Sequence, residues 1–407
     1  MIDKSFFYRL KIFTLNLFVF SIFFENWKPF DVSFTIVKFI GIIYVLLSLG
    51  DLKSNFNLKF NKKIILSLIL LWIWLILRSM LNYWEGNSVD AFHFSFLQNI
   101  LFLWLFTNDI IRNPRILKWL LISYIAGVSI LGLLILNGVG IETNAFYESN
   151  RITFFGANSN NIGNWCAIGI ILILGIIMTK IPINFIYKTL MVLSIPVLTA
   201  VIMSTGSRGA LLGLGAGVLV LFSGFRSKLY VKILYLVSGF FSLYYLNDFI
   251  ENSEVMSKRI ALFLETGDEA RMNIWKDSIN IIYDNPFFGL GNTGFESEML
   301  LRYGYFLDTH NIFLYFLVSG GIIALGLYIY MLYNIFLNIL KNKIRNTMLL
   351  PLALFVIYII IVFKGGGILN EKSPWLILGL AYVFLAFCQK IESSNNNLKH
   401  ESSLRHR

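Results

Sequence analysis

The chain has 407 residues, of which 57% are hydrophobic and only 14% are charged, with a formal net charge of +11. Soluble domains carry about 25% charged residues, so this composition excludes an ordinary soluble enzyme. The positive charge does not indicate a nucleic-acid-binding protein, because the basic residues lie in loops between apolar segments and form no basic stripe.

Long apolar segments recur along the whole chain, each near the roughly 20 residues that a helix needs to cross a bilayer. None shows the alternation typical of a membrane β-barrel. The predicted fold class is therefore all-α, a polytopic transmembrane helical bundle of about twelve spans. The predicted spans are 7–24, 32–50, 64–82, 92–110, 116–136, 159–179, 183–203, 208–224, 229–249, 311–337, 347–363 and 374–389.

Lys and Arg are distributed unevenly between alternate loops. With the N-terminus placed inside, the inner segments hold 21 of them, the short outer loops hold 5, and the long segment 250–309 holds 5 more. Because cytoplasmic loops are enriched in Lys and Arg, both termini are predicted to be cytoplasmic. The segment 250–309, between the ninth and tenth spans, is then on the outer face, which in a bacterium is the periplasm.

The predicted membrane domain covers 1–391 and includes this outer loop. Residues 392–407 are polar and rich in Asn and Ser, and we expect a disordered cytoplasmic tail. Within the loop, apolar residues from Glu269 to Tyr283 recur at helical spacing and predict one amphipathic helix near the membrane surface. Asn285-Pro286 ends this helix, and a Gly-rich turn follows.

Several eye-catching features have ordinary explanations. Trp72 and Trp74 lie near a span end, where interface anchoring accounts for tryptophan. The segment Gly289–Gly294 matches G-x-G-x-x-G, but no strand precedes it and no βαβ unit surrounds it, so a turn is predicted. Cys166 and Cys388 lie inside apolar spans and have no metal-ligand spacing. We expect no cofactor, no metal and no nucleotide-driven chemistry.

Arg208 is one of the few outer-side cations, and it begins a predicted span just after Ser207, a candidate N-cap. Because a helix N-terminus is already positive, a cation there is unfavourable unless an anion lies beside it. Arg208 and free backbone N–H groups would then bind that anion together. The alternative is an interface arginine that extends its charged end into water.

His310 precedes the next span after the long loop. A histidine near a helix N-terminus tends to stay neutral, and a neutral imidazole accepts a proton, so His310 is a candidate general base. The alternative is an interfacial cap residue. Arg271, on the predicted loop helix, and Arg151, on another outer loop, share a side with Arg208 and His310. Two or three converging guanidinium groups would suit a pyrophosphate.

Polar residues accompany these groups on the same side. Asn160 and Asn161 enter the sixth span, where they either cap the helix or line a wet cavity suited to carbohydrate hydroxyls. Arg302 lies in the long loop shortly before Thr309-His310-Asn311. These residues are further candidates for substrate binding on the same side.

Four segments resemble, in order and spacing, the O-antigen ligase and O-antigen polymerase superfamily of bacterial envelope glycosyltransferases. Arg151 to Asn164 resembles its Arg-then-Asn outer segment, and Thr205 to Leu214 its Ser-Arg-Gly signature. Arg271 to Phe295 resembles its large periplasmic loop. Thr309-His310-Asn311, followed by Gly320-Gly321, resembles its His-Asn element. The first 140 residues match only as generic spans.

The resemblance implies the all-helical GT-C membrane fold and an inverting, metal-independent transfer in the periplasm. The donor would be a glycan on undecaprenyl pyrophosphate. Arg208 and Arg271 would grip and stabilise the pyrophosphate leaving group, and His310 would activate the acceptor hydroxyl. The substrate-binding residues expected around them are Arg151, Ser207, Asn160, Asn161, Asn311 and Arg302.

The resemblance leaves the acceptor open. A polymerase extends another lipid-linked repeat unit, whereas a ligase caps lipid A-core or, in related enzymes, a protein. We favour the polymerase because that branch is more numerous. Expected partners are the donor, the acceptor, membrane lipids and a polysaccharide chain-length regulator. Two alternatives belong to other classes: a transporter or flippase of the lipid-linked glycan, and a non-catalytic scaffold in a polysaccharide assembly complex.

Overall fold

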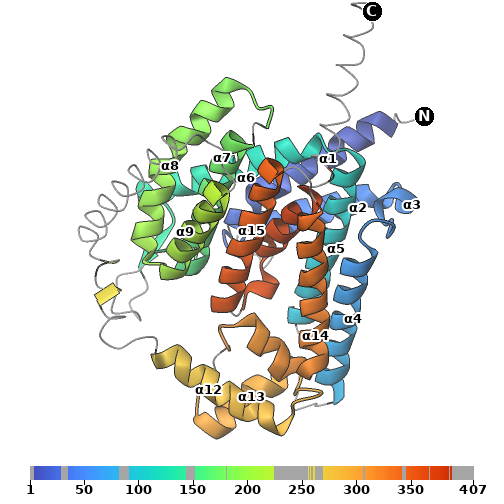
Figure 1. Cartoon of the computed structure of the whole chain (residues 1–407), viewed down its shortest axis with the longest axis vertical. Helices are drawn as coiled ribbons and strands as arrows, with labels where there is room; N and C mark the ends of the chain where they lie inside the picture. The colour runs from blue at the N-terminus through green and yellow to red at the C-terminus, as the bar shows by residue number, and fades with distance from the viewer. Residues whose placement is uncertain are drawn as a thin grey trace, which may run out of the picture. The chain divides into compact units, whose positions relative to one another are not determined.

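The structure is a computed structural model of the whole chain. It describes residues 4–28, 35–81, 91–143, 152–179, 181–223, 255, 257, 260–261, 269–305, 308–341, 345–365, 367–384 and 386. The described part is mainly helical, as Figure 1 shows. The predicted tail at 392–407 and the first part of the predicted outer loop, including most of 250–268, lie outside the described residues.

The chain divides into two compact units. The first consists of Met1–Leu15, Ile42–Leu120 and Ala270–Arg407, and the second of Asn16–Gly41 and Leu121–Glu269. Each unit has its own set of packed helices.

Seven described helices are long and apolar enough to cross a membrane. They are α1 (Lys4–Ser21, continued by η1, Ile22–Phe24), α4 (Lys62–Leu81), α5 (Ala91–Arg112), α6 (Ile116–Leu136), α7 (Ser159–Met178), α8 (Phe185–Thr205) and α14 (Ile312–Leu340). Shorter apolar helices are α2 (Ile36–Leu49), α9 (Arg208–Ser223), the stretch Met348–Lys364 of α15 (Arg345–Lys364), and Lys372–Phe384.

Helices therefore stand at eleven of the twelve predicted spans, and the other, 229–249, lies outside the described residues. A multi-pass helical membrane protein is confirmed, while the count of twelve spans stays a prediction. The all-α prediction needs one correction: β1 (Ile141–Thr143) pairs antiparallel with β2 (Ile152–Phe154). Both strands carry β-branched residues, which favour extended backbone.

The first unit is built around α4 and α14, which lie beside each other in Figure 1. Leu68, Leu71 and Leu75 of α4 recur at helical spacing and are fully buried. The helix α5 packs on α4, and α15 packs on α14. Short elements complete the unit: α3 (Leu52–Asn55) and η2 (Gly367–Asn370), which both contact α5.

Two further helices of the first unit come from the predicted outer loop. The amphipathic helix predicted from Glu269 is confirmed as α12 (Glu269–Asp284). A second helix, α13 (Asn292–Tyr303), was not predicted, because it follows directly on a Gly-rich stretch that favours a turn. Buried residues join α12 and α13 to α14: Ile274, Ile281, Phe295, Met299 and Val318.

The span predicted at 311–337 is not one continuous helix. Gly321 in α14 has φ 64° and ψ −163°, so the helix breaks there into Ile312–Gly320 and Ile322–Leu340. A positive φ of this kind is the conformation in which glycine is favoured. The apolar sequence continues through the break, and for this reason hydropathy alone predicted a single span.

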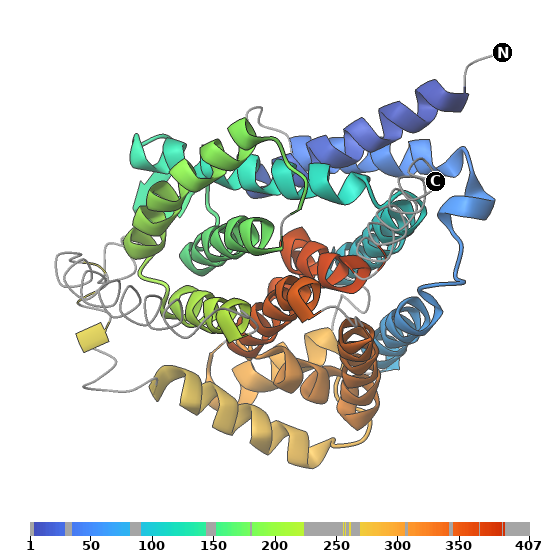
Figure 2. The same ribbon diagram turned by 45° about the horizontal axis from the view of Figure 1, so that its top comes forward.

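In the second unit, α7 lies between α8 and α9, which appear in green in Figures 1 and 2. Glycines bring the backbones close together. A Cβ atom on Gly163 would lie 2.8 Å from the Cβ of Ser207 and 3.1 Å from that of Ala210, and one on Gly217 would lie 2.7 Å from Ile171. Contacts near the start of both helices and again two turns later show that α7 and α9 run parallel.

Candidate active site

The Ser207-Arg208 element is a helix boundary in the second unit. The helix α8 ends at Thr205, Gly206 adopts the left-handed conformation with φ 61°, and α9 begins at Arg208. The buried Ser207 accepts a hydrogen bond from the N–H of Ala210 at 3.3 Å through its Oγ. The predicted N-cap is therefore confirmed. Arg208 is half-buried in the first turn of α9.

The start of α7 lies beside this boundary. Asn158 caps α7 by accepting from the N–H of Asn160 at 2.9 Å, and Asn160 and Asn161 are half-buried in the first turn. Gly163, one turn later, contacts Ser207. The positive ends of two parallel helix dipoles therefore lie side by side next to a guanidinium group, an arrangement that favours a bound anion. Arg151 lies outside the described residues.

The His310 turn belongs to the first unit and is anchored on both sides. Thr309 is fully buried, and its Oγ1 donates to the carbonyl of Asn311 at 2.9 Å. The buried Asn311 caps α14 by accepting from the N–H groups of Phe313 and Leu314, at 2.9 and 3.2 Å. The predicted span begins one residue later than expected, at Ile312.

Between these two anchors, His310 has φ 48°, a conformation uncommon for a residue with a side chain. Its N–H donates to Oδ1 of Asp308 at 3.1 Å. The imidazole is half-buried, so part of it is open to a substrate. Backbone strain held by buried neighbours is concentrated at functional sites, but the role of His310 as a reactive group stays a prediction.

The helix α12 is tied to this turn. The indole N–H of Trp275 donates to the carbonyl of Thr309 at 3.0 Å, and its ring packs against Phe363 of α15. Arg271 lies four residues before Trp275 and therefore on the same side of α12. Arg271 is half-buried. The hydrogen bond of Trp275 thus connects the helix that carries Arg271 to the turn that carries His310.

Arg302 is held differently. On α13, its guanidinium contacts Asp284 at 2.5 Å and Glu298 at 2.6 Å. Hydrogen bonds to Asp284 and then to Glu298 raise the pKa of Arg302 above its ordinary value. Two carboxylates already balance its charge, so the pairing favours a structural role over the predicted contact with an anionic substrate.

The predicted residues therefore form two groups. Ser207, Arg208, Asn160 and Asn161 lie together in the second unit. The first unit holds Arg271, Arg302, His310 and Asn311. The convergence of both groups on one substrate stays a prediction. Sequence reasoning missed Trp275 and Asp308 as partners of the His310 turn, although the Arg-x-x-x-Trp spacing places Arg271 and Trp275 on one helix face.

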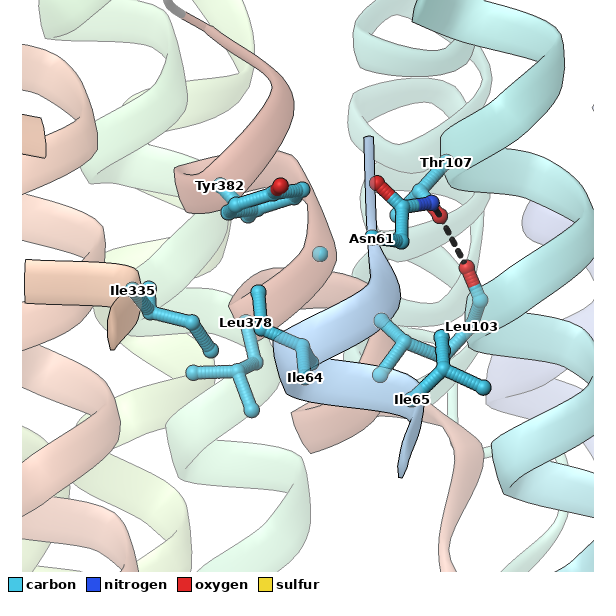
Figure 3. A pocket seen from close by; sticks show the side chains of 9 residues that line it. Asn61, Ile64, Ile65, Leu103, Thr107, Ile335, Leu378 and Tyr382 are labelled. Carbon is cyan, nitrogen blue, oxygen red and sulfur yellow. Dashed lines mark hydrogen bonds between the residues drawn. The ribbon is translucent and has the colours of Figure 1, made fainter. Parts of the chain in front are cut away.

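The described part of the chain contains no cluster of three or more His, Cys, Asp or Glu residues arranged to hold a metal ion. One small cavity of about 10 Å³ lies in the first unit (Figure 3), lined by residues such as Ile64, Leu103, Ile335 and Tyr382. Its lining is mainly apolar and contains none of the predicted site residues.

Comparison with known proteins agrees with the motifs. Residues 189–329 match a family described as O-Antigen ligase. The chain is also 29% identical over 191 residues to a protein named O-antigen ligase from Pseudomonas aeruginosa, which covers 46% of this chain and 39% of that relative. Both findings support the O-antigen ligase and polymerase superfamily, so the resemblance stated from the motifs is confirmed.

The matched region does not contain every predicted site residue. It includes Ser207, Arg208, Arg271, Arg302, His310 and Asn311. It leaves out Arg151, Asn160 and Asn161, which precede residue 189. The chain matches less than half the length of the Pseudomonas aeruginosa relative.

Proposed function

We propose that this protein is a membrane glycosyltransferase that moves a glycan from undecaprenyl pyrophosphate to an acceptor hydroxyl on the periplasmic side of the bacterial inner membrane. The observation that carries the proposal is the His310 turn. A strained, partly accessible imidazole is fixed by buried Thr309 and Asn311 and tied through Trp275 to the helix that carries Arg271. The match to the O-antigen ligase family supports the same reaction class.

In this proposal the acceptor oxygen attacks the anomeric carbon of the donor glycan while the bond from that carbon to the pyrophosphate oxygen breaks. The electron pair leaves with the pyrophosphate, and the proton of the acceptor hydroxyl passes to His310. The anomeric configuration is inverted. A general base of this kind contributes about 10²–10⁴-fold to the rate.

The leaving group needs compensation for its growing negative charge. Arg271 in the first unit and Arg208 at the paired starts of α7 and α9 in the second would supply it. Fixed cations and helix N-termini at a water-poor membrane edge stabilise such charge more than water does. Arg151, Ser207, Asn160, Asn161 and Asn311 would complete the binding of the glycan and the diphosphate.

We propose first that the protein is a polymerase, whose acceptor is another lipid-linked repeat unit. A ligase acting on lipid A-core is the second, because the Pseudomonas aeruginosa relative is named O-antigen ligase. Both termini would be cytoplasmic, and a polysaccharide chain-length regulator would be a partner of the polymerase. The reaction is proposed to need no metal.

A deletion strain of the source organism tests the function, with surface polysaccharide resolved by gel electrophoresis. A ladder that collapses to core plus one repeat indicates a polymerase, whereas loss of all capped core with accumulation of lipid-linked polymer indicates a ligase. Complementation with Arg208→Ala, Arg271→Ala or His310→Ala is expected to fail although each variant accumulates. Arg302→Ala, at an arginine already paired with carboxylates, is the matched control. Near-normal polysaccharide from the three test variants would overturn the proposal.

A further inference from the structure

The break in α14 leaves three backbone carbonyls without their usual helical partners. In a continuous helix, the carbonyls of residues 318, 319 and 320 accept from the N–H groups four residues later. Here Val318 accepts from the N–H of Leu290 and Ser319 from that of Gly291, both at 2.8 Å. Gly320 accepts from the indole N–H of Trp74, also at 2.8 Å. All three carbonyls are therefore satisfied from outside the helix.

The donors at 290 and 291 belong to a segment that enters the break, residues 286–291, called here the docked segment. Its Pro286 carbonyl accepts from the N–H of Ile322 at 3.0 Å. A Cβ atom on Gly321 would lie 2.1 Å from the carbonyl oxygen of Phe287, and one on Gly289 would lie 2.5 Å from the N of Gly320. The backbones approach so closely that only glycine fits at both positions. The turn predicted at Gly289–Gly294 is correct only for 289–291, which belong to this docking contact, because α13 begins at Asn292.

The helix α4 holds both partners of this contact. Four residues after Trp74, on the same face, Arg78 donates through Nη2 to the carbonyl of Gly289 at 2.8 Å. The rings of Trp74 and Phe288 also lie 6.0 Å apart. Interface anchoring was the only role predicted for Trp74, and the structure adds a hydrogen bond inside the protein. Both residues lie outside the family match at 189–329.

We infer that Trp74 and Arg78 are positioning residues for His310, an inference that rests on the proposed function of that residue. The half-helix Ile312–Gly320 is about 13 Å long. A helix this short is marginal on its own, so its placement depends on contacts at its two ends. Asn311 and Trp275 hold the end next to His310, and Trp74 with the docked segment holds the other.

The consequence for catalysis follows from geometry. A displacement of about 1 Å at a reacting group costs up to about 100-fold in rate, even when the change lies far from the chemistry. Loss of the hydrogen bond to Gly320 removes one of the contacts that hold this end of the half-helix, and His310 lies at its other end. Trp74 therefore acts through His310 and touches no substrate.

The test compares Trp74→Phe with Trp104→Phe in the purified full chain in nanodiscs. Both changes remove one indole N–H, and that of Trp104 donates to the carbonyl of Asn57 at 3.3 Å, away from the break. The probe is lipid-linked glycan extracted from the deletion strain. We expect kcat to fall about tenfold or more in Trp74→Phe with little change in the donor KM, and Trp104→Phe to equal wild type. Equal rates in the two variants would overturn the inference.

Two further measurements separate positioning from general stability. In a His310→Ala background, Trp74→Phe is expected to cause no additional fall, because no base remains to be positioned. Hydrogen exchange is expected to accelerate at 312–320 but not at 325–340. If wild type transfers no glycan, the proposed function fails, and the exchange comparison still decides whether Trp74 holds the half-helix. Unchanged exchange at 312–320 would refute that.

Arg78 provides a second pair of variants should Trp74→Phe fail to accumulate. Arg78→Met removes the donor to the Gly289 carbonyl, whereas Arg78→Lys keeps a donor at the end of a long side chain. Arg78→Met is expected to lower kcat as Trp74→Phe does, and Arg78→Lys to restore most of it. Equal activity of Arg78→Met and wild type would contradict a positioning role for Arg78.

Discussion

In the first unit, the polar side chains near the two ends of α4 have different kinds of partner. Beside its first residues lies the Lys11 cluster, which consists of Lys11, Tyr44, Asn55 and Asp109, all at most 3% exposed. Nζ of Lys11 contacts Asp109 at 2.5 Å and Asn55 at 2.8 Å, and the hydroxyl of Tyr44 donates to the second oxygen of Asp109 at 2.8 Å. The positive charge of Lys11 is thus balanced by the negative charge of Asp109 inside the protein.

At the other end of α4, polar side chains donate hydrogen bonds to backbone carbonyls. Trp74 and Arg78 donate to carbonyls of the break and of the docked segment, and among the described residues no carboxylate forms an ion pair with Arg78. His310, at the far end of the half-helix, is strained and partly exposed. Breaking a balanced buried cluster costs stability, whereas strained residues are concentrated at functional sites.

The sharpest way to break this comparison is His310→Gly. Removal of the proposed base is expected to lower glycan transfer by about 10²–10⁴-fold. Glycine adopts a φ of 48° without strain, so stability is expected to stay unchanged or rise by up to about 1 kcal/mol. Transfer assays and thermal unfolding in detergent measure the two effects. A clear loss of stability would show that His310 is a packing residue like those of the Lys11 cluster.

The opposite result is expected at the Lys11 cluster. Asp109→Ala leaves a buried ammonium group without its partner and is expected to destabilise the protein by about 3–5 kcal/mol. The double change Lys11→Met with Asp109→Leu removes both charges and is expected to recover most of that loss. Thermal unfolding and accumulation in the membrane report it. If the double variant is no more stable than Asp109→Ala, the cluster does more than balance charge.

A smaller effect is expected at Trp275, which contacts the His310 turn. Trp275→Phe keeps the ring against Phe363 but removes the hydrogen bond to Thr309, which is worth about 1 kcal/mol of stability. Transfer is expected to fall about tenfold, because the His310 turn loses its tie to α12. Trp104→Phe is again the control, since its indole N–H lies outside this turn. Equal transfer by both variants would show that the hydrogen bond from α12 does not position the His310 turn.

The fold was predictable where the bilayer dictates it. An apolar run of about 20 residues predicts a span whatever surrounds it, so eleven predicted spans coincide with helices. The break at Gly321 was not predictable in this way. It depends on a docked segment some 30 residues earlier in the chain and on Trp74, more than 240 residues away. Hydropathy does not register contacts of that kind.

The candidate site shows the same division between local and distant causes. Capping involves residues within one turn, so Ser207 was recognisable from its neighbours alone. The pairing of Arg302 with Asp284 joins two helices and depends on how α12 and α13 pack. An outer-side arginine that ignores the positive-inside bias looks the same in sequence whether it binds a ligand or a carboxylate. Only the packed structure shows the carboxylates that hold Arg302.

The smallest expected effect concerns Ser207, which was predicted both as a cap and as a substrate contact. If capping is its whole contribution, Ser207→Ala costs about 1 kcal/mol of stability and Ser207→Gly only a few tenths, because glycine is tolerated at an N-cap. Transfer would then be nearly wild type in the glycine variant. If the hydroxyl also binds substrate, both variants lose transfer equally, whatever their thermal stability. The glycine variant therefore decides whether the boundary between α8 and α9 only positions Arg208 or also contacts the glycan donor.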